Sequence, residues 1–359
     1  MVIPLSEDEG VKSFEYIWVL RCSGTNVNRN VEYRLTPQAP ADGIRPLIEV
    51  VDVGIFRRFA TSLRRKYGEI LVDFPLYLLE SSNKFFESIQ ELSRRYSNQT
   101  SFFQSFQSLI DIPVVSASQM GILDYNAERS ILQNMKQHFE RLAVRVRVPT
   151  FDLSRAQTIL GSYQSLLATM TEADLLLFDV FSMSGVENQI NLNLELMSRL
   201  GKEKNLELFV LNAFEPFDLR HNYGPIFSYR YDLNGFGDLA TEKRFPPAGG
   251  RAQRRIIRYY YWDRYMLKEI ARTNYHLAAL QLRNSPYWAN HAHHIPSCNV
   301  CGEVNNNRYN EGHSYWKRFR MLHYLNSITN ETRKQFTLAT SDEDLDPDGF
   351  DILFNVGES

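Results

Sequence analysis

Ala173–Val180 reads ADLLLFDV, and after one helical segment Leu206–Leu211 reads LELFVL. Both runs are almost entirely apolar, as is the PVV sequence at 113–115. A strand of a parallel sheet is covered by helices on both faces, so its sequence lacks the polar alternation of a half-exposed strand. These runs therefore predict a parallel sheet that is covered on both sides.

Further strands and helices are predicted outward from these runs. The other strand segments are Tyr16–Arg21, Pro46–Val53, Glu69–Phe74, Ile112–Ser116, Ala143–Val148 and Ile226–Asp232. Helical spacing is found in Phe56–Arg65, Lys84–Tyr96, Asn126–Arg141, Leu153–Met170 and Val186–Leu200. Strands that alternate with helices indicate βαβ units. About eight strands in some 240 residues fit a (β/α)8 TIM-like barrel. An open doubly wound α/β sheet is the alternative, although no G-x-G-x-x-G follows the first strand.

The chain divides into three parts by composition. Residues 1–240 form the predicted barrel, 241–340 an aromatic, Cys/His-containing region that completes or decorates it, and 341–359 an acidic tail. A loop rich in Gly and Pro is expected at Asn234–Arg255, with a tight glycine turn at 235–238. Beyond it we expect a Tyr-rich strand or turn, a helix from Met266 to Leu282, and a further helix near Trp316–Leu325.

Composition limits the class of protein. Hydrophobic residues make up 43% and charged residues 23% of the 359 residues, which is typical of a globular chain. The formal net charge is −2, whereas a nucleic-acid-binding domain is usually basic. Three cysteines are too few for a disulfide framework and favour a reducing compartment. Without a signal peptide or a long apolar run, we expect a cytoplasmic protein with no membrane partner.

Charged residues interrupt several of the apolar strands. In Val-Arg-Val-Arg-Val, successive side chains point to opposite faces, so Arg145 and Arg147 share one face. In a barrel the valines would face the helices and the arginines the lumen. Buried guanidinium groups need anionic partners, and Glu49, Asp73 and Asp179 are the candidates.

This charged group has two interpretations. It is either an acid/base or anion-binding site at the barrel mouth, where catalytic residues of this fold collect, or a structural network of salt bridges. In the catalytic interpretation the three carboxylates hold Mg²⁺ or Mn²⁺ and the two arginines bind phosphate, as in a phosphodiesterase or nuclease. Asp238, in the glycine turn, presents one further carboxylate that belongs either to a site or simply to a turn.

The second candidate site is Cys298-Asn-Val-Cys301. A C-x2-C pair is a common half of a structural zinc site. His291 and His294 lie upstream and would complete a tetrahedral set of two thiolates and two imidazoles. The alternative is a pair of thiols without metal and surface histidines.

The third candidate site is a basic and aromatic stretch that includes Arg255, Arg258 and Tyr260. Arginines interleaved with stacking aromatic rings suit nucleotides or single-stranded nucleic acid. A solvated basic loop that enters a packed Tyr-rich strand is the alternative.

Several short segments resemble the phage "beta protein" family. They are Ile44–Glu49 (IRPLIE), Val72-Asp73, Phe236-Gly-Asp238, Arg255–Tyr259 (RIIRY), and the late C-x2-C followed by Trp316 and His323. The family occurs in phages and bacterial genomes, often near defence genes. The resemblance implies a barrel-like protein and marks Glu49, Asp73, Asp238 and Arg258 as candidate site residues, without an established reaction.

Two functions from different classes follow. The first is a component of a phage–host conflict system, either antiviral or phage-encoded, that binds or senses a protein partner or phage component and forms a homo-oligomer. The second is the metal-dependent phosphodiesterase or nuclease described above. The two functions differ in the arrangement of the lumenal carboxylates. The metal-dependent enzyme needs room for a metal between them, whereas in a structural network each carboxylate is paired with an arginine.

Overall fold

The structure is a computed structural model that describes residues 14–23, 39, 42–96, 98–116, 126–148, 156–180, 187–212, 224–240, 255–261, 266–272, 275–284 and 313–333. Eight parallel strands pair in sequence order, and β8 pairs with β1, so the sheet closes on itself. The strands are β1 (Glu15–Cys22), β2 (Ile44–Val50), β3 (Leu71–Asp73), β4 (Ile112–Ser116), β5 (Ala143–Arg147), β6 (Leu175–Asp179), β7 (Glu207–Leu211) and β8 (Gly235–Asp238). This closed arrangement is the predicted (β/α)8 barrel and not the open sheet.

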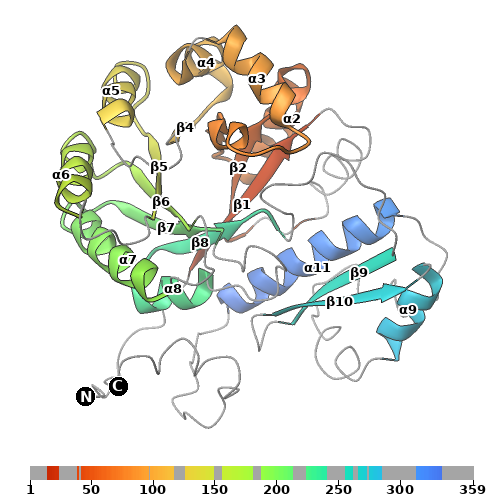
Figure 1. Cartoon of the computed structure of the whole chain (residues 1–359). Coiled ribbons are helices and arrows are strands. Elements are labelled where there is room, and N and C mark those ends of the chain that lie inside the picture. Colours follow the sequence, from red (N-terminus) through yellow and green to blue (C-terminus); the bar gives the residue numbers. More distant parts are fainter. Residues whose placement is uncertain are drawn as a thin grey trace, which may run out of the picture.

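Helices connect most of the strands and surround the barrel (Figure 1). They are α2 (Val53–Tyr67), α3 (Phe86–Arg95), α4 (Gln99–Ser105), α5 (Asn126–Met135), α6 (Ala156–Leu167), α7 (Glu187–Lys202) and α8 (Gly224–Arg230). Two short 3₁₀ segments, η1 (Leu76–Leu79) and η2 (Gln107–Leu109), lie between β3 and β4. In the part of the chain that the structure describes, no helix is long and apolar enough to cross a membrane.

The local sequence explains how α2 begins and ends. The Asp52 side chain accepts a hydrogen bond from the Gly54 amide at 2.8 Å, which satisfies an otherwise unpaired N–H at the first turn. Gly68 ends the helix with a φ of 81°, a left-handed conformation that glycine adopts without steric cost. The apolar side of α2, which includes Phe56, Phe59 and Leu63, is buried against the barrel.

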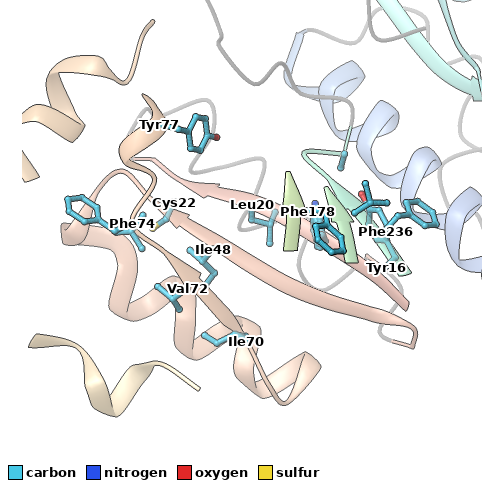
Figure 2. Close-up of a cluster of buried hydrophobic side chains, with 14 of the residues drawn as sticks. Tyr16, Leu20, Cys22, Ile48, Ile70, Val72, Phe74, Tyr77, Phe178 and Phe236 are labelled. Atoms are coloured by element: carbon cyan, nitrogen blue, oxygen red, sulfur yellow. The ribbon is translucent and has the colours of Figure 1, made fainter. Parts of the chain in front are cut away.

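The core has two layers because side chains alternate along each strand. Trp18 and Leu20 of β1 belong to the large cluster between the strands and the surrounding helices, part of which Figure 2 shows. Ile17 and Val19 belong to a smaller cluster inside the barrel. The lumen is therefore filled by side chains, as is usual for this fold.

The last strand of the barrel differs from the prediction. The segment 226–232, expected to be a strand, lies mostly in α8. Phe227 of this helix and Tyr231, the residue directly after it, are both buried and their rings are in contact. The expected glycine turn is instead β8. A Cβ on Gly235 would lie 1.9 Å from the Glu15 carbonyl oxygen, and a Cβ on Gly237 2.4 Å from that of Ile17. Glycine is required at both positions because the β1 backbone passes so close to them. Strand propensities do not reveal this requirement.

The C-terminal region also differs in part from the prediction. Met266–Arg272, expected to begin a helix, is strand β10 and pairs antiparallel with β9 (Arg255–Tyr261). Pairing with the tyrosine-rich β9 outweighs the helix propensity of this segment. Helix α9 (Tyr275–Arg283) follows, and α11 (His313–Arg333) contacts both β9 and the barrel strand β1 (Figure 1).

We predict that Gly237→Ala lowers the free energy of unfolding by about 3 kcal/mol, because the added methyl group overlaps the β1 backbone. The measurement is urea denaturation. Gly161→Ala in α6 is the matched control, since its added Cβ meets nothing within 4 Å. It should raise stability by about 0.5–1 kcal/mol through helix propensity. Equal effects of the two variants would contradict the close-approach argument.

Candidate functional site

Charged and polar side chains gather at the carboxyl ends of the barrel strands. Glu49 is the next-to-last residue of β2, and Asp73 and Asp179 are the last residues of β3 and β6. Arg21 is the next-to-last residue of β1. This end of a (β/α)8 barrel is where active sites of the fold are built. All four residues are buried, with Glu49 and Asp73 at 0% exposure.

Arg145 of β5 is the centre of the group. Its Nε donates to Asp179 Oδ2 at 2.7 Å, and its Nη1 donates to Glu49 Oε1 at 2.9 Å and to Asp73 Oδ2 at 2.6 Å. Val144 and Val146 on either side belong to the outer cluster. The alternation in Val-Arg-Val therefore places this guanidinium in the lumen, where it joins three strands other than its own.

A second arginine and a tyrosine complete one side of the group. Arg21 Nε donates to Glu49 Oε2 at 2.8 Å, and Arg21 Nη2 donates to the Tyr77 hydroxyl at 2.8 Å. The Tyr77 hydroxyl donates to Glu49 Oε1 at 2.6 Å. Tyr77 lies in η1, and its ring centroid is 4.8 Å from Cζ of Arg145. The η1 segment thus covers part of the guanidinium with an aromatic face.

Neutral side chains orient two of the carboxylates. The Ser116 hydroxyl donates to Asp73 Oδ1 at 2.7 Å, and Gln99 bonds both the backbone N–H and C=O of Ser116. Asn212 donates to Asp179 Oδ1 at 3.1 Å from a left-handed backbone with φ of 58°. Because each contact fixes an oxygen, the carboxylates have defined orientations.

Sequence reasoning did not single out Arg21, Tyr77 or Ser116. Arg21 shares a strand face with Ile17 and Val19, so the alternation used for Arg145 could have found it. The sequence offers no such signal for Tyr77, which reaches the site through a loop.

Burial and charge act in opposite directions on these groups. Burial alone lowers the pKa of Arg145, but Asp179, Glu49 and Asp73 raise it, so the group stays charged. Burial raises the pKa of Glu49, but Arg21 and Arg145 hold it below its usual value. For Asp73, burial prevails over the attraction of Arg145, and the nearby Glu49 adds to it, which raises the pKa to about 6. Asp73 is therefore suited to exchange a proton near neutral pH.

One donor of the central guanidinium is unused. Arg145 is 3% exposed, and its buried Nη2 has no hydrogen-bond partner among the described residues. A buried donor without an acceptor is costly. The position beside Nη2 is consequently where a ligand oxygen would be stabilised.

Arg147, predicted to join the lumenal carboxylates, pairs with Glu80 of the β3–α3 connection. Glu80 directly follows η1, the segment that contains Tyr77, so this ion pair connects the last residue of β5 to the β3–α3 connection.

Asp238, proposed as a site residue, faces the outer wall of the barrel and not the lumen. Its Oδ1 accepts from the Tyr16 hydroxyl at 2.8 Å and from the Ala240 amide at 2.7 Å, and its Oδ2 accepts from the Tyr324 hydroxyl of α11. The cause is the strand register of β8, where glycines take the lumenal positions because β1 passes close to them. Asp238 thus ties α11 to the barrel.

The remaining candidates were metal- and nucleic-acid-binding residues. Cys298, Cys301, His291 and His294 lie outside the described residues. Arg255, Arg258 and Tyr260 lie in β9, opposite Arg272, Glu269 and Leu267 of β10. Within the described ranges, no group of three or more His, Cys, Asp or Glu side chains is arranged to hold a metal ion. Among the lumenal carboxylates, Arg145 occupies the central position.

No protein-family model and no curated protein matches the chain. Solved structures that resemble it include triosephosphate isomerase from Bartonella henselae, with 13% identity, a TM-score of 0.40, and coverage of 64% of this chain and 94% of that one. A β-amylase catalytic domain from Paenibacillus polymyxa has 10% identity, a TM-score of 0.38, and coverage of 64% and 92%. Dihydropteroate synthase from Anaplasma phagocytophilum has 10% identity, a TM-score of 0.37, and coverage of 63% and 94%. At such identities the likeness concerns the fold alone.

We predict that Asp73→Asn becomes more stable relative to the wild type as pH rises. The folded pKa of about 6 exceeds the reference value of 3.8, so the native state binds more protons between these values. The wild type therefore loses stability as pH rises through that window, by about 3 kcal/mol in total, whereas the amide does not titrate. Urea denaturation at pH 4, 5, 6 and 7 measures the difference. A difference that shrinks with rising pH would contradict the role of burial.

We also predict that Tyr324→Phe lowers the free energy of unfolding by about 1–3 kcal/mol, because Asp238 loses a buried donor. Tyr67→Phe is the matched control. The Tyr67 hydroxyl is buried and has no hydrogen-bond partner in the described structure, so its removal should be neutral or stabilising. Thermal denaturation compares the two, and equal losses would refute Asp238 as the anchor of α11.

Proposed function

We propose that this chain is a cytoplasmic component of a phage–host conflict system, either antiviral or phage-encoded, and that it acts by binding. The resemblance to the phage "beta protein" family supports the biological setting. We place the binding site for a small ligand at the barrel mouth around Arg145. The C-terminal region with β9, β10 and α11 is then the surface for a protein partner, a phage component or a second copy of the chain.

The observation that carries the binding site is the unused Nη2 of Arg145. A purely structural network gains most when every buried donor has an acceptor. Here one guanidinium nitrogen remains without an acceptor in the described structure, at the end of the barrel where ligands of this fold bind.

The raised pKa of Asp73 points the same way. Burial raises the pKa of Asp73 to about 6, so its ionisation at neutral pH lowers the stability of the folded state. Natural proteins retain groups that lower the stability of the fold chiefly at functional sites. Asp73 and Arg145 are in direct contact, so the carboxylate with the raised pKa and the guanidinium with the unused Nη2 lie in the same site.

A metal-dependent phosphodiesterase or nuclease is the second candidate. The observation that favours it is the convergence of Glu49, Asp73 and Asp179 at the mouth, since hard divalent ions prefer carboxylate oxygens. Mg²⁺ or Mn²⁺ would have to displace the Arg145 guanidinium from its central position. This requirement ranks the candidate below a binding function. The zinc site that the sequence predicts at Cys298 and Cys301 is independent of both candidate functions.

We predict that Arg145→Lys and Asp73→Asn remove the effect of the chain on phage infection. Lysine keeps the charge but loses the planar fork that reaches three carboxylates and the ligand. The measurement is the plating efficiency of a phage panel on cells that express the wild type or each variant, at matched levels of folded protein.

Arg141→Lys is the matched control, because Arg141 pairs with Glu69 and Glu207 at the opposite end of the barrel. It should behave like the wild type. The proposal fails if no phage in the panel plates differently on cells with the wild-type chain, or if folded Arg145→Lys acts like the wild type.

A further inference from the structure

We infer that the β3–α3 connection is a gate over the barrel mouth, closed by the side chains of Tyr77 and Glu80. A ligand reaches Arg145 only when these two side chains move away. This inference rests on the proposed binding function and concerns the regulation of that same site.

Two side chains of the connection contact the three arginines near the carboxyl ends of β1 and β5. The Tyr77 ring centroid lies 4.8 Å from Cζ of Arg145, and the Tyr77 hydroxyl accepts from Arg21 Nη2 at 2.8 Å. Glu80 forms an ion pair with Arg147, the last residue of β5. The three arginines are 3–8% exposed, so the mouth of the barrel is closed in this arrangement.

The backbone of the connection has supports of its own. The Asn83 side chain donates from Nδ2 to the carbonyl oxygens of Leu78 and Ser81, both at 2.7 Å. Leu78 is fully buried in the outer cluster, on the helix side of the strands. Because these contacts do not involve the lumenal charges, Tyr77 and Glu80 can rotate away while the backbone that carries them stays in place.

The closed arrangement leaves polar atoms without partners. Arg145 Nη2, in the guanidinium that the Tyr77 ring covers, is buried and has no hydrogen-bond partner among the described residues, and Ser81 Oγ of the connection is in the same condition. Such atoms lower the stability of the closed arrangement. Displacement of Tyr77 admits water or a ligand to the guanidinium, which reduces the free-energy difference between closed and open arrangements.

The gate makes a ligand compete with the side chains of the chain itself. Tyr77 contacts Arg145 and Arg21, and Glu80 contacts Arg147, so a ligand of the mouth replaces these contacts when it enters. The apparent affinity for that ligand is then lower than the affinity of the open site, by the fraction of molecules in which the gate is open.

The first experiment measures how Arg145 becomes accessible in the wild type. Phenylglyoxal reacts with accessible guanidinium groups, and peptide mass spectrometry gives its rate at each arginine. We expect the rate at Arg145 to stay nearly constant up to about 2 M urea, because side-chain opening exposes little surface. A rate that rises steeply with urea, in parallel with the unfolded fraction seen by circular dichroism, would mean that only unfolding exposes Arg145 and would overturn the inference.

Glu80→Gln is the decisive variant. It removes the ion pair with Arg147, and we expect the rate at Arg145 to rise about tenfold because the closed arrangement loses a charge-assisted contact. Arg145 hydrogen-bonds to the three lumenal carboxylates and not to Glu80, so its own reactivity is unchanged by the substitution. An unchanged rate at Arg145 in folded Glu80→Gln overturns the gate.

Glu69→Gln is the matched control, since it breaks an ion pair of the same kind with Arg141 at the opposite end of the barrel. It should leave the rate at Arg145 as in the wild type. Equal acceleration in both variants would show general destabilisation and would also overturn the gate. The reaction involves no ligand, so its failure concerns the gate alone, while the phage plating assay decides the proposed function separately.

Discussion

The guanidinium of Arg145 is the interaction on which the candidate site depends. From β5 it reaches carboxylates on β2, β3 and β6, so a single side chain joins four of the eight strands across the lumen. A charge in this position is tolerable only with several anionic partners, and each of those anions is tolerable only because of the arginine. Removal of the Arg145 guanidinium would leave these three buried carboxylates without the cation that they share, which makes Arg145 the central member of the group.

Two features of this unit lower the stability of the fold. Burial raises the pKa of Asp73 to about 6 despite its contact with Arg145, and the Nη2 of Arg145 has no hydrogen-bond partner among the described residues. A network selected for stability alone would gain from the loss of both features. Their coexistence within one hydrogen bond suggests a site in which a ligand completes the set of contacts.

The outer wall of the barrel uses a carboxylate for a different purpose. Asp238 accepts hydrogen bonds from Tyr16 on β1 and Tyr324 on α11, and the Tyr16 and Tyr324 ring centroids are 6.3 Å apart. Helix α11 thereby covers barrel strands at the seam where β8 meets β1. The C-terminal region is thus joined to the barrel at the last residue of β8, the strand that closes the sheet. Leu239 and Ala240 follow this residue.

The sequence by itself indicated a parallel sheet with both faces covered and showed which residues of β5 share a face, whereas the pairing of β8 with β1 showed that the sheet is a closed barrel and not the alternative open sheet. Apolar runs such as LLLF are buried on both sides when helices cover both faces of the sheet. The alternation in Val-Arg-Val fixes which side chains share a face. Tertiary structure alone decided the rest. β8 is a glycine strand because β1 lies against it, Asp238 faces outward because of that register, and Tyr77 reaches Arg145 through a loop. Each depends on contacts between segments distant in sequence, which local propensity and periodicity do not encode.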